Sequence, residues 1–204
     1  MKTVIKIILT CVIALLIILL VMSIRKPIKF NKEMNKRYAV TIKRLKDIRT
    51  IQEAFKSKYD RYTASWDTLV DFIKHDSLEI EKPDRHIPDT LDLKEAIKLD
   101  LVKMIVTRIA VKDTLFKKRY SADSIRYVPF TAGVEFELGT NVLETAAKIK
   151  VNVFEASVKN EVLLDGLDPQ LIANLDDQKE TLTGFPGLKV GSLEEANNNA
   201  GNWE

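Results

Sequence analysis

The residue types that most often carry out chemistry are few and scattered in this sequence of 204 residues. His75 and His86 lie eleven residues apart, one at the end of an expected helix and the other in an expected loop. No cysteine lies near them, so the ligand set of a zinc site is missing and solvent exposure is expected. The acidic pairs at 176–177 and 194–195 are adjacent residues, so their side chains diverge and are expected at the solvated surface. We therefore predict no catalytic residue, no metal site, no cofactor and no enzymatic activity.

Four aromatic side chains are the candidates for a ligand-binding surface: Tyr120, Tyr127, Phe130 and Trp203. The first three lie in or beside segments with the alternation of a strand. An apolar side chain on a strand either packs into the core or lies on an outer, concave face, and both alternatives stay open here. Trp203 lies in an Asn-rich end, where it is either a binding anchor or the side chain that packs this end onto the domain.

The longest apolar run is the most informative stretch of the chain. Residues 7–24, from Ile7 to Ile24, carry no charge and consist almost entirely of aliphatic side chains. Eighteen helical residues rise roughly 27 Å, close to the hydrocarbon thickness of a bilayer. An Arg-Lys-Pro sequence follows the run in place of a cleavage site, so we expect an uncleaved signal anchor in contact with membrane lipid. A cleaved or lipidated segment is the alternative. Cys11, the only cysteine, is expected to face lipid or a partner helix.

Charge is distributed unevenly, although the formal net charge is only +3. Residues 24–61 hold thirteen Lys or Arg against four Asp or Glu, whereas residues 62–204 hold seventeen against twenty-five. A basic collar beside the span can contact anionic lipid headgroups. The alternative is that these residues are the solvated face of a long helix. Nucleic acid is not an expected partner, because the basic residues are not interleaved with exposed aromatics. The residues assigned to membrane-surface contact are Arg25, Lys26, Lys29 and Lys32.

Two helices are expected after the span. Pro27 should end or kink the spanning helix, and Asn31 can cap a new one. Apolar residues at steps of three and four then define one stripe that we expect to be buried. The 28 helical residues 32–59 would be roughly 42 Å long, and the part nearest the membrane is expected to be an exposed stalk. Ser65 should cap a second, shorter helix with its own apolar face. The stripe consists of Met34, Tyr38, Ile42, Leu45, Ile48, Ile51, Phe55 and Tyr59, and the second face of Trp66, Leu69, Val70, Phe72 and Ile73.

The hydrophobic period changes in the second half of the chain. Residues 76–89 contain two prolines amid charges and are predicted to form a loop, followed by a helix to about residue 99. All seven glycines lie between Gly133 and Gly201, as turns between short strands require. Alternation predicts strands at residues 103–111, 127–130, 134–138 and 148–154, with a local turn at 121–124.

Two helices are expected near the C-terminus: one that begins at Pro169 with Asp168 as its N-cap, and a short one capped by Ser192. The Asn-rich end is expected to pack only through Trp203. The fold class is therefore α+β, with a transmembrane helix, a long amphipathic helix and a short helical hairpin, then a small antiparallel sheet with a late helix. The predicted organisation is a signal anchor (1–26), a basic stalk helix and helical hairpin (27–75), a loop (76–89), an α+β soluble domain (90–191) and a polar tail (192–204).

Residues 45–55 (LKDIRTIQEAF) and 59–63 (YDRYT), followed by Leu69, resemble the end of the long helix in the pilin and pseudopilin family. In that family a membrane-embedded N-terminal helix continues into a soluble domain and packs on a small antiparallel sheet. The resemblance implies a domain on the periplasmic side. The prepilin processing motif of the family is missing, because residues 4–8 read VIKII and the apolar run holds no acidic residue.

Over its full length the chain resembles uncharacterised single-pass inner-membrane proteins of Bacteroides-type bacteria. The similarity rests on the N-terminal architecture, residues 113–116 (DTLF), 127–130 (YVPF) and 187–192 (GLKVGS), and the Asn-rich end at Trp203. It implies a bacterial inner-membrane protein and implies no activity.

We therefore predict a non-enzymatic, single-pass envelope protein that is a structural or assembly subunit of a larger membrane complex, with a pseudopilin-like architecture. Its expected partners are membrane lipid and other membrane or envelope proteins. The alternative is a membrane-tethered periplasmic module that binds a ligand or an envelope polymer. The positive charge after the span favours a cytoplasmic domain, whereas the pilin resemblance implies a periplasmic one; we expect the periplasm.

Overall fold

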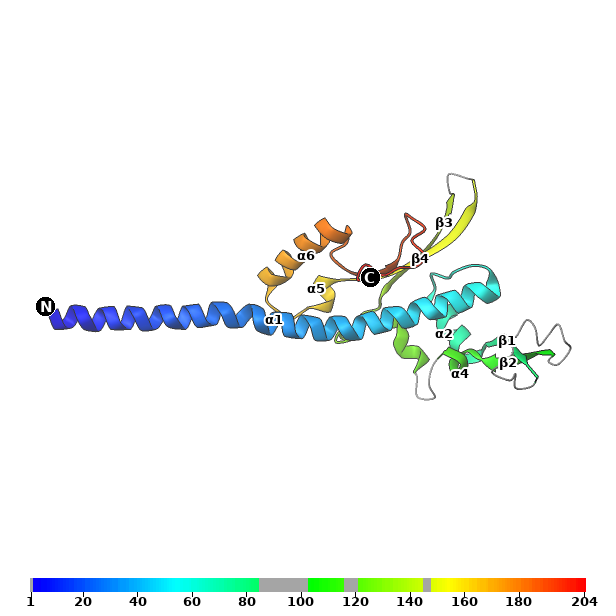
Figure 1. The fold of residues 1–204 in the computed structure, drawn as a ribbon, viewed down its shortest axis with the longest axis horizontal. Helices are drawn as coiled ribbons and strands as arrows, with labels where there is room; N and C mark the ends of the chain where they lie inside the picture. Colours follow the sequence, from blue (N-terminus) through cyan, green and yellow to red (C-terminus); the bar gives the residue numbers. More distant parts are fainter. Residues whose placement is uncertain (1, 85–102, 116–120, 145–147) are drawn as a thin grey trace, which may run out of the picture.

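The structure is a computed structural model that describes residues 2–84, 103–115, 121–144 and 148–204. It confirms the predicted α+β class: a long N-terminal helix is followed by shorter helices and by antiparallel sheets of two and three strands (Figure 1). The helix predicted to reach residue 99, along with Tyr120 and His86, lies outside the described residues.

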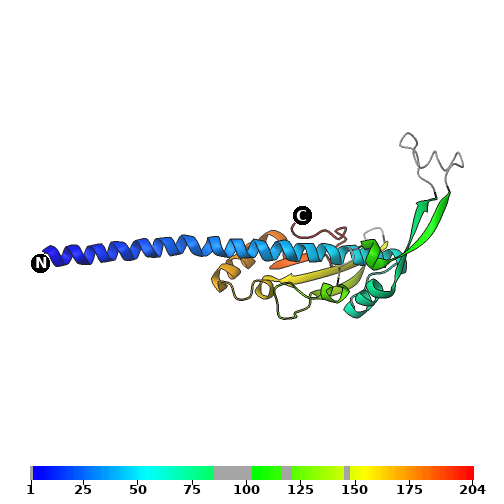
Figure 2. The same cartoon turned by 90° about the horizontal axis from the view of Figure 1, so that it is seen from below.

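The first helix, α1 (Lys2–Tyr59), runs through 58 residues, about 87 Å at the usual rise per residue. Pro27 lies inside it, and the ribbon of α1 is unbroken in Figures 1 and 2. The prediction of a helix end at Pro27 and a new helix capped by Asn31 is therefore wrong. A proline inside a helix costs about 3 kcal/mol, because it removes one backbone donor and crowds the preceding turn. Core packing of the stripe beyond Pro27 offsets this cost.

The surroundings of α1 change at Phe30, the first buried residue of the helix. The predicted stripe is confirmed from there on: Leu45, Ile48, Ile51 and Phe55 are buried, and Met34, Tyr38 and Ile42 are partly buried against the core. Tyr59, at the helix end, is 47% exposed. The expected exposed stalk is wrong, because the domain already packs against the helix at Phe30.

Gln52 fixes the turn between α1 and α2 (Trp66–His75). Its side chain is fully buried, donates to the carbonyl of Thr63 (2.7 Å) and accepts from the Thr63 N–H (3.2 Å). Ser65 caps α2 as predicted and accepts from the N–H of Thr68. All five residues predicted for the buried face of α2 are buried.

Two strands, β1 (Ser77–Pro83) and β2 (Met104–Ala110), pair antiparallel and project from the rest of the domain (Figure 2). β2 confirms the strand predicted at 103–111, but the predicted loop at 76–89 is wrong where β1 lies. The charged side chains of β1 suit a strand whose faces are exposed. Glu79 lies opposite Arg108 in the ladder, and its carboxylate oxygen is 2.8 Å from the Arg108 guanidinium. Pro83 is tolerated as the last residue of the strand. A short helix, α4 (Val111–Leu115), follows β2.

The second sheet has the order β3-β4-β5, with β3 (Glu137–Glu144), β4 (Lys150–Lys159) and β5 (Gly187–Gly191) all antiparallel. β4 confirms the strand predicted at 148–154. The other two predictions differ: residues 127–130 form only an isolated bridge, between Tyr127 and Glu135, and β3 begins later than residue 134. The segment before the bridge is a 3-10 helix, η1 (Ala122–Arg126), rather than a simple turn. Sequence reasoning missed β5.

The C-terminal half packs back onto α1 mainly through β5, while α5 (Asn160–Leu163) and α6 (Pro169–Thr183) contact it elsewhere along the helix. α6 is confirmed with its cap, since Asp168 accepts from the N–H of Gln170. The predicted short helix at Ser192 is wrong: the hydroxyl accepts two backbone N–H groups, but no helix follows. The tail also packs through more than Trp203, because Gly201 bridges Val190 and Glu204 pairs with Arg49 (3.0 Å).

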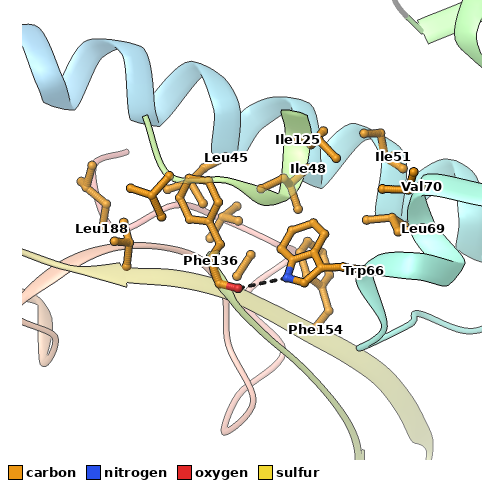
Figure 3. Close-up of a cluster of buried hydrophobic side chains, with 14 of the residues drawn as sticks. Leu45, Ile48, Ile51, Trp66, Leu69, Val70, Ile125, Phe136, Phe154 and Leu188 are labelled. Carbon is orange, nitrogen blue, oxygen red and sulfur yellow. Dashed lines mark hydrogen bonds between the residues drawn. The ribbon is translucent and has the colours of Figure 1, made fainter. Parts of the chain in front are cut away.

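The core lies where α1 and α2 cover the three-stranded sheet (Figure 3). Trp66, predicted to be a core residue, is buried, and its indole N–H donates to the carbonyl of Phe136 (3.0 Å). Phe154, from β4, and Leu188, from β5, are fully buried in the same cluster. The second half of α1 is therefore a structural member of the domain.

Candidate membrane anchor and membrane-facing surface

The first half of α1 is long and apolar enough to cross a membrane. Residues 3–26 are all exposed, and this part of the helix extends away from the domain in Figure 1. Within the span, Thr10 satisfies its hydroxyl locally by donating to the carbonyl of Lys6 (2.9 Å). An exposed helix surface that is apolar on every side suits a hydrocarbon surrounding rather than water.

The basic collar lies at the point where the apolar run of α1 meets the domain. Its four members, Arg25, Lys26, Lys29 and Lys32, are all exposed, and none makes an ion pair with another residue in the described part of the chain. At 100° per residue, Arg25, Lys29 and Lys32 share one face of α1, whereas Lys26 points about a quarter-turn away. The collar can therefore present its charges to lipid phosphates.

The domain is joined to the helix just beyond this collar by Arg37 and Tyr38. The Arg37 guanidinium donates to the carbonyls of Leu163 and Asp165, both at 3.0 Å. Tyr38 donates to the side-chain oxygen of the buried Asn160 (2.5 Å), and the Asn160 amide donates to Asp176 (2.7 Å). Burial raises the pKa of the Tyr38 hydroxyl well above its usual value. These bonds hold α5 and α6 against the part of α1 that follows the collar.

This polar network corrects one expectation and reveals a residue that the sequence did not indicate. Asp176 was expected to be solvated with Asp177; Asp177 is exposed, but Asp176 is half-buried and hydrogen-bonded. Asn160 is fully buried. No motif surrounds it, so only the fold shows that it joins two elements.

The structure describes three of the four candidate aromatic residues. Tyr127 is 40% exposed and Phe130 is 49% exposed, both in the segment after η1. Trp203 is half-buried and packs over Gly201, and its buried indole N–H has no hydrogen-bond partner among the described residues. Tyr120 lies outside the described residues.

Phe130 has an unusual position. Its backbone φ is 66°, a left-handed conformation that is uncommon for a bulky side chain. Two cations lie near its ring: Lys36 Nζ at 5.7 Å and the Arg37 guanidinium at 5.9 Å from the centroid. An exposed aromatic ring beside positive charge is a candidate contact for an anionic or planar ligand.

The histidine that the structure describes is part of a surface pair. His75 Nδ1 lies 2.7 Å from Asp71 Oδ1, one turn earlier on α2, and both side chains are more than 70% exposed. A hollow of about 400 Å³ beside them is also lined by Tyr59, Arg61 and Asp76. Solvent screens such a pair, so it lacks the water-excluded surroundings that make a His–carboxylate pair effective in catalysis.

A larger hollow, of about 710 Å³, lies at the base of the β1–β2 hairpin. Its charged walls are already paired, because Lys58 contacts Asp76 and Arg108 contacts Glu79. Among the residues that the structure describes, no group of three or more His, Cys, Asp or Glu side chains is placed to hold a metal ion.

Comparisons of the chain with models of known protein families, with curated proteins and with solved structures give no match. The resemblances to pilins and to Bacteroides-type membrane proteins therefore stay predictions.

Proposed function

We propose that this chain is a single-pass envelope protein of a bacterial inner membrane and a structural or assembly subunit of a larger membrane complex. The observation that supports it is the continuity of α1, which supplies both the apolar span and the main helical stripe of the core. A domain built on its own anchor is held in a fixed orientation, as a scaffold requires, whereas a flexible linker would let it rotate.

The β1–β2 hairpin is the candidate contact with a partner. It projects from the domain, and β2 exposes Met104, Ile105 and Val106. An isolated two-stranded hairpin is marginally stable in water. Successive strand residues point to opposite faces, so these apolar side chains are exposed on both faces of the hairpin, as a contact with a partner protein would require.

Purification in mild detergent followed by chemical crosslinking tests this proposal. We expect a crosslinked complex that is lost when Ile105 and Val106 are both replaced by Thr, since threonine keeps the strand propensity and reduces the apolar surface. Leu182→Thr, at another exposed apolar position, is the matched control and should leave the complex intact. A protein that is strictly monomeric, with nothing copurifying, would contradict the proposal.

A second candidate function is a tethered module that binds an envelope polymer or another ligand. The exposed Phe130, with its left-handed backbone and two cations near its ring, favours it, because such backbone outliers gather at functional sites. If this function is correct, Phe130→Ala reduces retention of the detergent-solubilised protein on isolated envelope polymers, whereas Leu182→Ala does not. Equal retention of both variants would exclude Phe130 as the contact.

We further propose that the domain lies in the periplasm, which the charge after the span opposes and the pilin resemblance supports. A single cysteine at Leu182, with Cys11 replaced by Ser, reports the side directly, since this position is 72% exposed at the end of α6. An impermeant maleimide should label it in cells whose outer membrane is permeabilised. Labelling only after lysis of the inner membrane would place the domain in the cytoplasm.

A further inference from the structure

A hollow of about 520 Å³ separates the first turn of α6 from α1. On the α1 side it is lined by Leu19, Met22 and Lys26, and on the α6 side by Asp168, Gln170 and Leu171. α6 begins at the end of the domain that faces the apolar half of α1, as Figures 1 and 2 show from two directions. The hollow is therefore at the junction between the anchor and the domain.

The position of this hollow along α1 sets its depth in a bilayer. If Ile24 marks the edge of the hydrocarbon, Met22 lies about 3 Å and Leu19 about 7 Å inside it, whereas Lys26 lies about 3 Å outside. The hollow therefore opens across the boundary between acyl chains and headgroups. Leu171, on the facing wall, is brought to the level of the headgroups or the upper acyl chains.

The polarity of the lining residues also changes with depth. The deeper wall is apolar, through Leu19 and Met22, and the shallower wall carries the ammonium of Lys26 and the polar groups of Asp168 and Gln170. A phospholipid has this order of polarity, from acyl chain to phosphate. Water at the depth of Leu19 would lose hydrogen bonds to its surroundings, and an empty space of this size would forfeit dispersion contacts.

We propose that the first turn of α6 enters the headgroup layer and that one phospholipid fills the space between α6 and α1, with its phosphate near Lys26. This inference rests on the proposed function, because it requires residues 7–24 to cross a membrane. Asp168 would face this phosphate from the α6 side of the hollow, and it already accepts the Gln170 N–H (3.1 Å). Its negative charge means that burial of the acyl chain, rather than anionic charge on the lipid, drives occupancy.

Lipid-quenching of a fluorescent label tests the inference in nanodiscs that each hold one copy of the full chain. An environment-sensitive label is attached to one cysteine at a time: the native Cys11 in the span, Leu171→Cys in the first turn of α6, or Leu182→Cys in its last turn, the last two with Cys11→Ser. Gln170→Cys, which also lines the hollow and is exposed, replaces Leu171→Cys if that variant does not fold. The quencher is a phospholipid that carries a nitroxide at the top of its acyl chain.

We expect the labels at Cys11 and at position 171 to lose fluorescence in the quenching lipid, and the label at position 182 to keep it. The loss at position 171 should be equal in zwitterionic and anionic nanodiscs. If position 171 behaves like position 182 while Cys11 is quenched, the inference is wrong and the anchor stands. Quenching at 171 only in anionic lipid would show that charge attraction by the collar, rather than a seated lipid, brings α6 to the surface. No quenching at any position would overturn the membrane anchor itself.

Discussion

The two halves of α1 differ in how their apolar side chains are arranged and in what surrounds them. The first half is apolar around its whole circumference between residues 7 and 24, and its side chains are exposed in the described structure. The second half confines its apolar side chains to one stripe and buries that stripe against a sheet and a second helix. A helix apolar on all sides requires an apolar solvent, whereas a stripe requires a partner on one side only. The side chains of α1 are therefore exposed before Phe30, and from Phe30 on the apolar stripe packs against the domain.

The largest expected contrast comes from truncating one aliphatic side chain in each half. Ile48 is fully buried, so Ile48→Ala should lower the free energy of unfolding of the domain by about 2–5 kcal/mol. Ile17→Ala removes the same atoms from the exposed half and should leave domain unfolding unchanged. Both are measured by denaturant titration of the full chain in detergent, with Trp66 and Trp203 as the fluorescent probes. Equal effects would contradict the division at Phe30.

Adding one charge to each half reverses the contrast. Leu16→Arg places a cation at the middle of the span, where it should cost about 3 kcal/mol in membrane insertion. Val40→Arg places the same charge on the exposed back of the second half, where Val40 is 43% exposed, and should have no effect. Resistance to alkaline extraction from membranes measures insertion. If both variants stay fully inserted, the first half is not the span.

A smaller effect is expected at the turn that ends α1. Gln52→Ala leaves the buried N–H and carbonyl of Thr63 without their partner, which should cost about 1–3 kcal/mol. Lys46→Ala, on the exposed side of the same half, is the control. A stability of Gln52→Ala equal to that of the control would show that the turn does not depend on this side chain.

The smallest effect is expected from an ion pair near the end of α1. Partial burial pushes the pKa of Asp76 upward, but hydrogen bonds from Lys58, Tyr59 and the Ser77 N–H outweigh it, so this pKa lies below its usual value. The ionised form therefore stabilises the fold above the ordinary Asp pKa, and this contribution is lost as pH falls through the lowered one. Asp76→Asn should cost less than about 1 kcal/mol at pH 7, and its difference from the unmodified protein should shrink as pH falls below about 4. Asp177→Asn is the exposed control; a pH-independent deficit of Asp76→Asn would refute the charge effect.

Sequence periodicity predicted the elements whose burial is one-sided. The stripe of α1, the buried face of α2, and α6 with its Asp168 cap all followed from spacing and capping residues, because a helix with one apolar face encodes its own orientation. The long apolar helix and its basic collar could also be predicted, because an uncharged run and its charged edge are properties of the sequence that need no tertiary contact.

The errors came where tertiary contacts override local signals. Proline breaks an isolated helix, yet Pro27 lies within α1 because packing holds the residues that follow it. β1 is charged and ends in proline, and only its pairing with β2 makes it a strand. β5 has just five residues with a glycine at each end, and its neighbours in space come from a distant part of the chain. Asn160 is one amide without a motif, and its role depends on Tyr38 and Asp176.

The continuity of α1 is the central claim, and one distance measures it. Spin labels at the native Cys11 and at Lys46→Cys, both exposed, are separated by thirty-five residues, or about 52 Å along an unbroken helix. Pulsed electron paramagnetic resonance on the full chain in nanodiscs should give a single narrow distribution near this value. A broad distribution centred well below it would show that the helix breaks at Pro27 and that the domain is not rigidly joined to its anchor.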